Sequence, residues 1–142
     1  MNRIIFLLGL FCFFTQALCA QLTPFKDEAT RLYGYKSPTG AIRISPRYNM
    51  ANGFRSGMAA VNKGAVVTNV TANGGKWGYI DSTGNLVIPM IYDYVQDFKG
   101  DSARVVRDGK KYLIDKKGKI IDQTKRYTLL RATEPVDWEK KQ

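Results

Sequence analysis

The chain contains an internal repeat, which strongly limits the folds it can adopt. Shifted by 44 residues, residues 33–63 align without a gap on residues 77–107, with nine identities in 31 pairs. Unrelated sequences of average composition would give about two. A shift of 34 residues aligns the second copy with a third, matching Lys76 with Lys110, Ile80 with Ile114, Asp81 with Asp115 and Gly84 with Gly118. The unit is therefore about 34 residues long, and the ten extra residues of the first copy are placed within residues 64–75.

Each unit has the sequence pattern of a β-hairpin. In the second copy, the aromatic and β-branched run of residues 76–81 leads into a turn with Asp81 at its first position and Gly84 at its fourth, as in tight turns between strands. The return strand stops at Pro89, which has no N–H for a ladder. One hairpin cannot bury its apolar side alone, so the copies must stack. We therefore predict an all-β fold: a short array of about two and a half antiparallel β-hairpin or meander repeats, as an open solenoid-like stack or a curved sheet.

The middle copy resembles a known repeat. Residues 76–89, which begin Lys-Trp-Gly-Tyr-Ile-Asp, are similar to the WG repeat of bacterial proteins. The first copy has Tyr33 in place of the Trp and Lys36 in place of the Ile, and the third has Lys111-Tyr112 in place of Trp-Gly. The resemblance covers about residues 24–122. It implies a repeat of β-hairpins, often exported, with no common activity and no defined catalytic residue.

Aromatic and glycine positions that recur between the copies are predicted to be structural. Trp77 beside Gly78 is interpreted as a core wedge against which backbone packs closely; the alternative is a stacking platform for a sugar ring. The turn glycines are expected at positive φ, which glycine adopts without a steric penalty. The residues assigned to the repeat core and its turns are Trp77, Gly78, Tyr48, Tyr92, Phe54, Phe98, Gly40, Gly84 and Gly118.

The N-terminus has the pattern of a secretory signal peptide. Arg3 precedes the apolar residues 4–14, and the small-residue stretch 17–20 follows. At about 1.5 Å per residue, this apolar run is too short to span a bilayer core of about 30 Å. We expect cleavage after Ala20 and export to the periplasm, the cell envelope or the medium. A lipoprotein acylated at Cys19 is less favoured, because Leu18 rather than a small residue precedes that cysteine.

These patterns divide the chain into segments. Residues 1–20 form the predicted signal peptide and residues 21–31 an N-terminal cap. The repeat domain covers residues 32–122, as units 32–75, 76–109 and 110–122, and residues 123–142 form a C-terminal strand and a polar tail. Cleavage removes both cysteines, Cys12 and Cys19, so the mature chain must be stabilised without disulfides. We expect no transmembrane segment in the mature chain.

The basic composition predicts an anionic partner. The chain has 22 Lys+Arg against 12 Asp+Glu, a formal charge of +10, and such a field attracts polyanions. We expect an anionic envelope glycan, lipopolysaccharide or an envelope protein that pairs with a strand edge, and no nucleic acid, because the chain has no motif for it. Protection of strand edges and solubility are the alternative reasons for the charge. Arg107 and Lys111 are expected on one surface stripe. The candidate polyanion-binding residues are Arg104, Arg107, Lys110, Lys111, Lys116, Lys117 and Lys119.

The chain lacks the residues of most catalytic sites. It has no His, the usual general base and the commonest metal ligand. Asp93, Asp97 and Asp101 are the candidates for acid–base chemistry, but turn chemistry explains them. We therefore predict a non-catalytic binding module of the cell envelope, without cofactor or metal. The alternative is an enzyme, or an enzyme inhibitor, that acts on cell-wall glycan.

Overall fold

The computed structural model describes residues 21–68 and 72–121; the predicted signal peptide and the predicted C-terminal strand and tail lie outside them. Within the described residues the regular elements are strands. They are β1 (Thr23–Lys26), β2 (Tyr33–Lys36), β3 (Ile42–Tyr48), β4 (Met50–Ala51), β5 (Met58–Val67), β6 (Ala72–Asp81), β7 (Leu86–Tyr92), β8 (Tyr94–Val95), β9 (Ser102–Arg107) and β10 (Lys110–Asp115). The predicted all-β array of antiparallel hairpins is confirmed.

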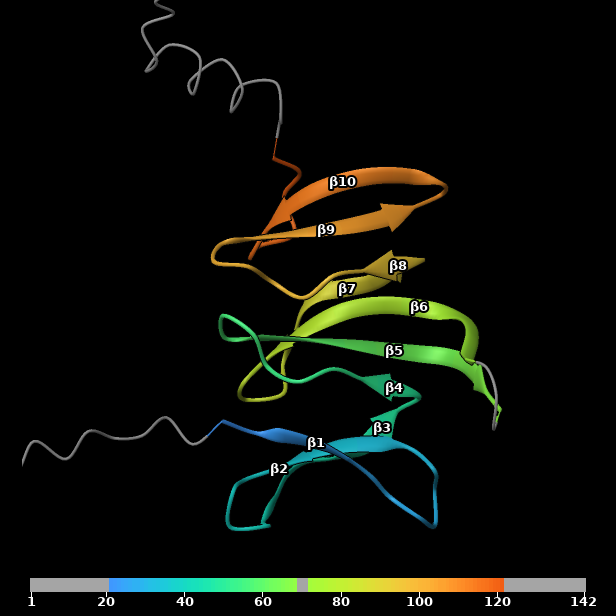
Figure 1. The fold of residues 1–142 in the computed structure, drawn as a ribbon, viewed down its shortest axis with the longest axis vertical. Helices are drawn as coiled ribbons and strands as arrows, with labels where there is room; N and C mark the ends of the chain where they lie inside the picture. Colours follow the sequence, from blue (N-terminus) through green and yellow to red (C-terminus); the bar gives the residue numbers. More distant parts are fainter. Residues whose placement is uncertain (1–20, 69–71, 122–142) are drawn as a thin grey trace, which may run out of the picture.

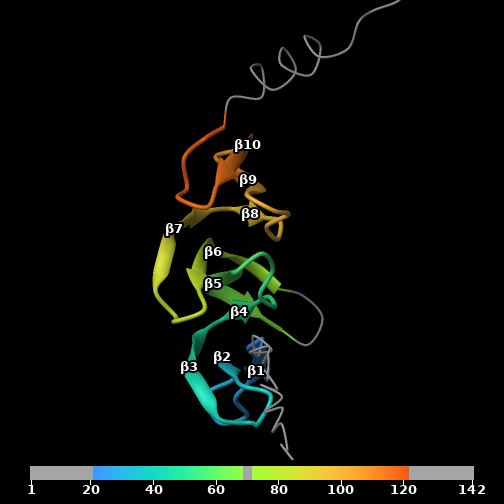
Figure 2. The ribbon, with the colours of Figure 1, turned by 90° about the vertical axis from the view of Figure 1, so that its left-hand side faces the viewer.

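The strands form three sheets that are stacked along the long axis of the molecule (Figure 1). Their strand orders are β1-β2-β3, β4-β5-β6-β7 and β10-β9-β8. Most strands run across the long axis, so consecutive sheets face one another, while β3 and β7 run along one side of the stack (Figure 2). The result is a linear stack with an end face at the β1–β3 sheet and another at the β8–β10 sheet.

The hairpins β2–β3 and β6–β7 share one register, with a register shift at equivalent places. The pairs Tyr33–Tyr48, Tyr35–Ile44 and Lys36–Ile42 of the first correspond to Trp77–Tyr92, Tyr79–Ile88 and Ile80–Leu86 of the second. The third copy starts in the same way, because Ile114 bridges to Ile120. The repeat seen in the sequence is thus also a repeat of backbone pairing.

The hairpin turns are built as their sequence pattern predicts. The carboxylate of Asp81 accepts the backbone N–H of Thr83 at 2.9 Å, and φ at Gly84 is +88°, a conformation that favours glycine. A Cβ at Gly84 would lie 3.1 Å from the side chain of Ile44. Ile44 belongs to β3, so the turn of the second unit rests on the return strand of the first.

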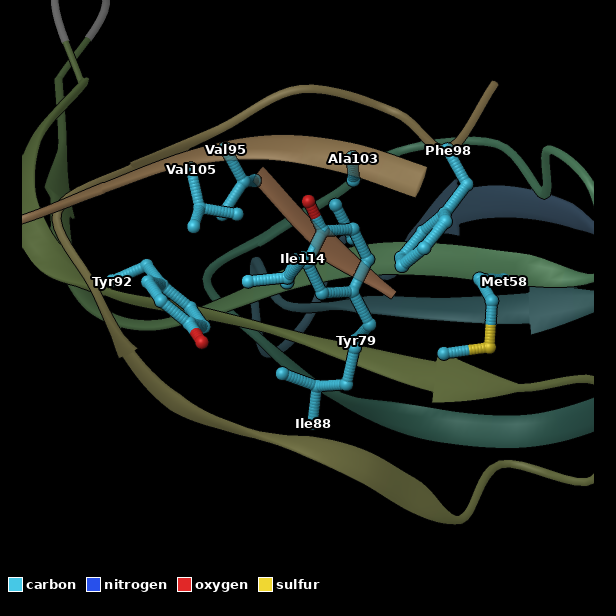
Figure 3. Close-up of a cluster of buried hydrophobic side chains, with 10 residues drawn as sticks. Met58, Tyr79, Ile88, Tyr92, Val95, Phe98, Ala103, Val105 and Ile114 are labelled. Carbon is cyan, nitrogen blue, oxygen red and sulfur yellow. The ribbon is translucent and has the colours of Figure 1, made fainter. Parts of the chain in front are cut away.

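Two buried clusters lie between the sheets and use equivalent positions. The first contains Tyr35, Ile44, Tyr48, Phe54, Ala59, Val61 and Ile80. The second contains their equivalents Tyr79, Ile88, Tyr92, Phe98, Ala103, Val105 and Ile114, with Met58, Ala60 and Val95 (Figure 3). Strand β5 contributes alternate residues to the two clusters, because successive side chains of a strand point to opposite faces. The middle sheet is therefore common to both cores.

The ten extra residues of the first unit lengthen one hairpin. Strand β5 has ten residues, whereas its equivalent β9 has six. The pairing of β5 with β6 continues from the core out to Val67 and Ala72. The insertion is therefore an extension of the β5–β6 hairpin and leaves the register of the core unchanged.

The segment predicted as an N-terminal cap contains β1. This strand pairs with β2 along its whole length, from Thr23 opposite Lys36 to Lys26 opposite Tyr33. It thereby covers the edge of β2 that would otherwise be unpaired.

Candidate functional site

The β8–β10 sheet has one face outside the stack. Its inner face carries Val105 and Ile114, which belong to the second core cluster. The outer face is hollowed into a solvent-open groove of about 900 Å³. The residues that line it include Tyr94, Arg104, Val106, Lys111, Leu113 and Ile121.

Strand register sets these side chains in two rows across the sheet. In one row Lys111 pairs with Val106, and Val106 pairs with Tyr94. In the other, Leu113 pairs with Arg104. Directly paired side chains have their Cβ atoms about 4.5–5.5 Å apart. Each row therefore places a cation beside an apolar side chain.

The groove thus combines an apolar floor with two cations on a sheet that is held by the core behind it. Val106, Leu113 and Ile121 form the floor, and Tyr94 is 56% exposed. Arg104 and Lys111 are exposed on the same face. An apolar site with a few placed polar groups is the usual construction of a binding site. Here both charged side chains are cations.

Arg107 and Lys111 lie on opposite faces of the sheet, so the predicted stripe that contains both is wrong. Arg107 pairs across the hairpin with Lys110, and Lys111 pairs with Val106. Parity relates residues within one strand, whereas these two lie on different strands. The turn between β9 and β10 decides which of their residues share a face.

The remaining candidate cations do not line the groove. The guanidinium of Arg107 is 5.7 Å from the ring centroid of Tyr112 and 3.8 Å from the carboxylate of Asp108. The ammonium of Lys116 lies 3.2 Å from the carboxylate of Asp101. Lys110 is exposed at the β9–β10 turn, and Lys117 and Lys119 are exposed after β10. Of the seven candidates, Arg104 and Lys111 are the two that line the groove.

The Trp-Gly pair of the second unit has a clear structural role at its glycine. A Cβ at Gly78 would lie 2.9 Å from the backbone nitrogen of Met90, and one at Gly34 would lie 2.8 Å from that of Pro46. The return strand therefore crosses close to this position, at the register shift. Trp77 is half-buried at the margin of the second cluster rather than inside it. At Trp77, β6 passes from the exposed hairpin extension into the stack.

A family comparison agrees with this repeat. The sequence model of the family described as WG containing repeat matches residues 33–65 and 77–110. The chain is a WG repeat protein. Comparisons with curated proteins and with solved structures give no match.

The most buried aromatic residues of the two WG repeats are tyrosines that sequence reasoning did not assign to the core. The hydroxyl groups of Tyr35 and Tyr79 donate to the carbonyls of Asn52 and Gln96, at 2.8 and 2.6 Å. Their rings pack edge-to-face on Phe54 and Phe98, with centroids 5.0 and 4.9 Å apart. Burial raises the pKa of both hydroxyls. The identity of Tyr35 and Tyr79 under the 44-residue shift was the signal that could have found them.

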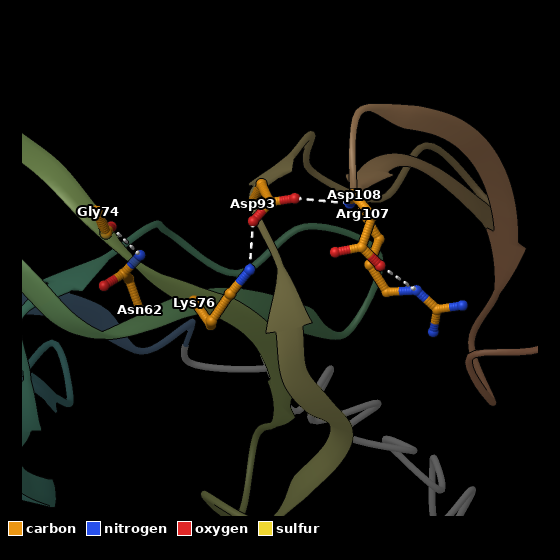
Figure 4. A network of polar contacts seen from close by, with 6 residues as sticks. All are labelled: Asn62, Gly74, Lys76, Asp93, Arg107 and Asp108. Carbon is orange, nitrogen blue, oxygen red and sulfur yellow. Dashed lines mark hydrogen bonds and ion pairs between the residues drawn. The ribbon is translucent and has the colours of Figure 1, made fainter.

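The grouped aspartates of the second WG repeat each have a structural partner. The carboxylate of Asp93 accepts the ammonium of Lys76 and, at 2.8 Å, the backbone N–H of Asp108 (Figure 4). Asp97 accepts the Nδ2 of Asn52 at 2.9 Å. Hydrogen bonding from Lys76 holds the pKa of Asp93 below its usual value. These contacts join segments that are distant in the sequence.

In the part of the chain that the structure describes, no three His, Cys, Asp or Glu residues form a group that could hold a metal ion. The same residues include no helix long and apolar enough to cross a membrane.

Proposed function

We propose that this WG repeat protein is an exported, non-catalytic binding module of the cell envelope, and that it binds an anionic glycan in the groove of the β8–β10 sheet. The observation that carries the proposal is the placement of Arg104 and Lys111 beside an apolar floor on one sheet face. Phosphate or carboxylate groups of the ligand pair with the two cations. The faces of its sugar rings lie on Tyr94 and Leu113. Lipopolysaccharide and carboxylated polysaccharides have this chemistry.

The charge of the whole chain supports the same ligand class. A formal charge of +10 raises the local concentration and the association rate of a polyanion. Such a field acts over roughly a Debye length, about 8 Å at physiological salt, and does not select a position on the surface. The groove provides the position, so the two contributions are separable by experiment.

The exported form is a suitable protein for this experiment. It would begin at Gln21, and both buried clusters lie within the described residues that follow. The packed partners of the clusters begin at Leu22 and end at Ile114. Residues 21–142 therefore retain the complete core.

The test compares two charge reversals of equal size. R104E/K111E changes the groove, and R55E/K63E changes one exposed Arg and one exposed Lys of the first unit. Affinity for lipopolysaccharide and for polygalacturonate is measured by calorimetry at low salt and near half-molar salt. We expect R104E/K111E to weaken binding about tenfold or more, since a hydrogen bond to a charged group is worth roughly 1.5–3 kcal/mol.

The control separates the groove from net charge. We expect R55E/K63E to weaken binding by no more than about twofold, because its charges lie outside the groove and are screened. Equal weakening by both variants would show that net charge, not the groove, binds the glycan. Unchanged binding by R104E/K111E would also reject the proposed site.

A further inference from the structure

The first residue of each return strand is an exposed aliphatic side chain. Ile42, Leu86 and Ile120 are 59, 51 and 52% exposed. They are equivalent positions of the three units, because they pair with Lys36, Ile80 and Ile114 in the same register. We call these three residues the aliphatic row.

The repetition of this exposure is the unusual feature. A single exposed aliphatic residue is ordinary on a protein surface, but here the same place is exposed in every unit. The position that pairs with the row behaves differently. It is Ile80 and Ile114 where a neighbouring sheet buries it, and Lys36 at the end face, where no sheet of the described residues follows. Position 42 in the same terminal pair remains an isoleucine. Burial in the core therefore does not explain the aliphatic row.

The segments that carry the aliphatic row lie along one side of the stack. Strands β3 and β7, which begin with Ile42 and Leu86, are on the same side, as is the orange chain that follows β10 (Figure 2). Stacked sheets are about 10 Å apart, so the row extends over roughly 20 Å. Val87 and Ile91 of β7 are exposed as well and widen its middle.

Cations accompany this row. Arg43 follows Ile42 and Lys119 precedes Ile120, and both are exposed. Arg47 is exposed on β3, with its guanidinium donating to the carbonyl of Gly84 at 2.8 Å. Cations therefore lie at both ends of the row, and Arg47 lies near its middle.

We propose that the aliphatic row is a docking surface for an anionic lipid bilayer. The segments that carry its members lie on one side of the stack (Figure 2), so a flat surface against that side can contact all three. Peripheral binding combines buried apolar area with attraction to anionic headgroups, and this side provides both. Ile120 also lines the end groove, but Ile42 and Leu86 lie outside it, so tests at those two residues do not depend on the proposed glycan site.

The test uses the exported form, residues 21–142, and vesicles of phosphatidylcholine with or without phosphatidylglycerol. The variant I42S/L86S removes two members of the row and leaves every groove residue unchanged. The control V66S/V67S removes two exposed aliphatic residues from the hairpin extension, where Val66 is 68% exposed. Because all four side chains are exposed, we expect both variants to remain folded by circular dichroism.

We expect the wild-type protein to co-sediment with the anionic vesicles at low salt. I42S/L86S should lose about fivefold or more of this binding, since hydrophobic burial contributes roughly 0.8 kcal/mol per buried CH₂, and V66S/V67S should change it by less than about twofold. A wild-type protein that does not bind these vesicles would overturn the proposal and leave a protein partner as the occupant. Equal binding by I42S/L86S and V66S/V67S would overturn it as well.

A second measurement does not depend on loss of binding. In L86W, the added tryptophan should shift its emission to shorter wavelength when anionic vesicles are added, relative to the wild-type change, and V66W should not. Glycan affinity of I42S/L86S should equal that of the wild type. If R104E/K111E loses glycan binding while I42S/L86S binds vesicles as well as the wild type does, the bilayer surface is rejected and the glycan site is not.

Discussion

At the scale of single residues, the glycine of the Trp-Gly pair is explained by the backbone of the return strand, which packs against it. Gly34 and Gly78 both sit at the register shift of a hairpin, where the return strand passes close to the first strand. The atoms that a side chain would meet are backbone atoms, which cannot rotate away. The requirement is therefore steric and local to the hairpin, and it does not involve a ligand.

This geometry predicts a large cost for Gly78→Ala. The new Cβ would lie 2.9 Å from the backbone nitrogen of Met90, so the return strand must shift. We expect the free energy of unfolding to fall by about 2–3 kcal/mol, as in overpacked cores, measured by urea denaturation. Gly53→Ala is the matched control, because a Cβ there meets no atom within 4 Å. A control as destabilised as Gly78→Ala would contradict the steric explanation.

At the scale of elements, the position that pairs with the start of the return strand shows how the stack ends. Ile80 and Ile114 are fully buried between sheets, whereas Lys36 is exposed. The degenerate residue of the first copy is thus a polar end cap, as expected for the terminal unit of an array. At the opposite end of the stack Leu113 lies on the outer face of the β8–β10 sheet, and there the groove is found.

A polar contact also joins elements, and it predicts a pH effect. Asp93 lies between β7 and β8 and binds Lys76 of β6 and the N–H of Asp108 after β9. Its pKa in the folded state lies below the ordinary value of 3.8, mainly through the hydrogen bond from Lys76. The carboxylate therefore stabilises the fold above that ordinary value, and the contribution is lost as the pH falls through the lower folded-state pKa.

We expect Asp93→Asn to be less stable than the wild type at pH 6, with a difference that shrinks as the pH approaches 2. Urea denaturation at a series of pH values measures this difference. Lys76→Met should also lose less stability than the wild type between pH 6 and pH 2, since it removes the main cause of the low pKa of Asp93. A difference between Asp93→Asn and wild type that is constant from pH 6 to pH 2 would contradict this assignment.

At the scale of the whole molecule, the shared middle sheet couples the two cores. Strand β5 has Ala59 and Val61 in the first cluster and Met58 and Ala60 in the second. Loss of one cluster exposes one face of the sheet on which the other is built. The stack should therefore unfold as one cooperative unit, although its repeats contact only their neighbours.

We predict that a small change in the first cluster also lowers the stability of the last sheet. Ile44→Val removes one methylene from the first cluster and should cost about 1 kcal/mol. Amide exchange of the slowest residues in β9 and β10 should accelerate by the corresponding factor of about five. Unchanged exchange in β9 and β10, with faster exchange in β2 and β3, would show that the clusters unfold separately.

Much of the fold could be predicted from the sequence, but less of the site. The hairpins, their turns and the place of the insertion follow from short-range patterns such as Asp81 with Gly84. That Arg107 and Lys111 lie on opposite faces of the sheet could not be predicted in this way, because it depends on the register across a turn. Tyr79 shows a further limit, since its hydroxyl partner, the carbonyl of Gln96, is 17 residues away.

The sequence by itself determined the repeat, the strands and the turn glycines, because these rest on interactions among residues a few positions apart. The tertiary structure alone decided which faces the stack leaves open. The end groove exists because no further described sheet covers Leu113 and Val106, and the aliphatic row exists because stacking aligns Ile42, Leu86 and Ile120. Exposure of a side chain depends on what packs against it from elsewhere in the chain, and residue order does not state this.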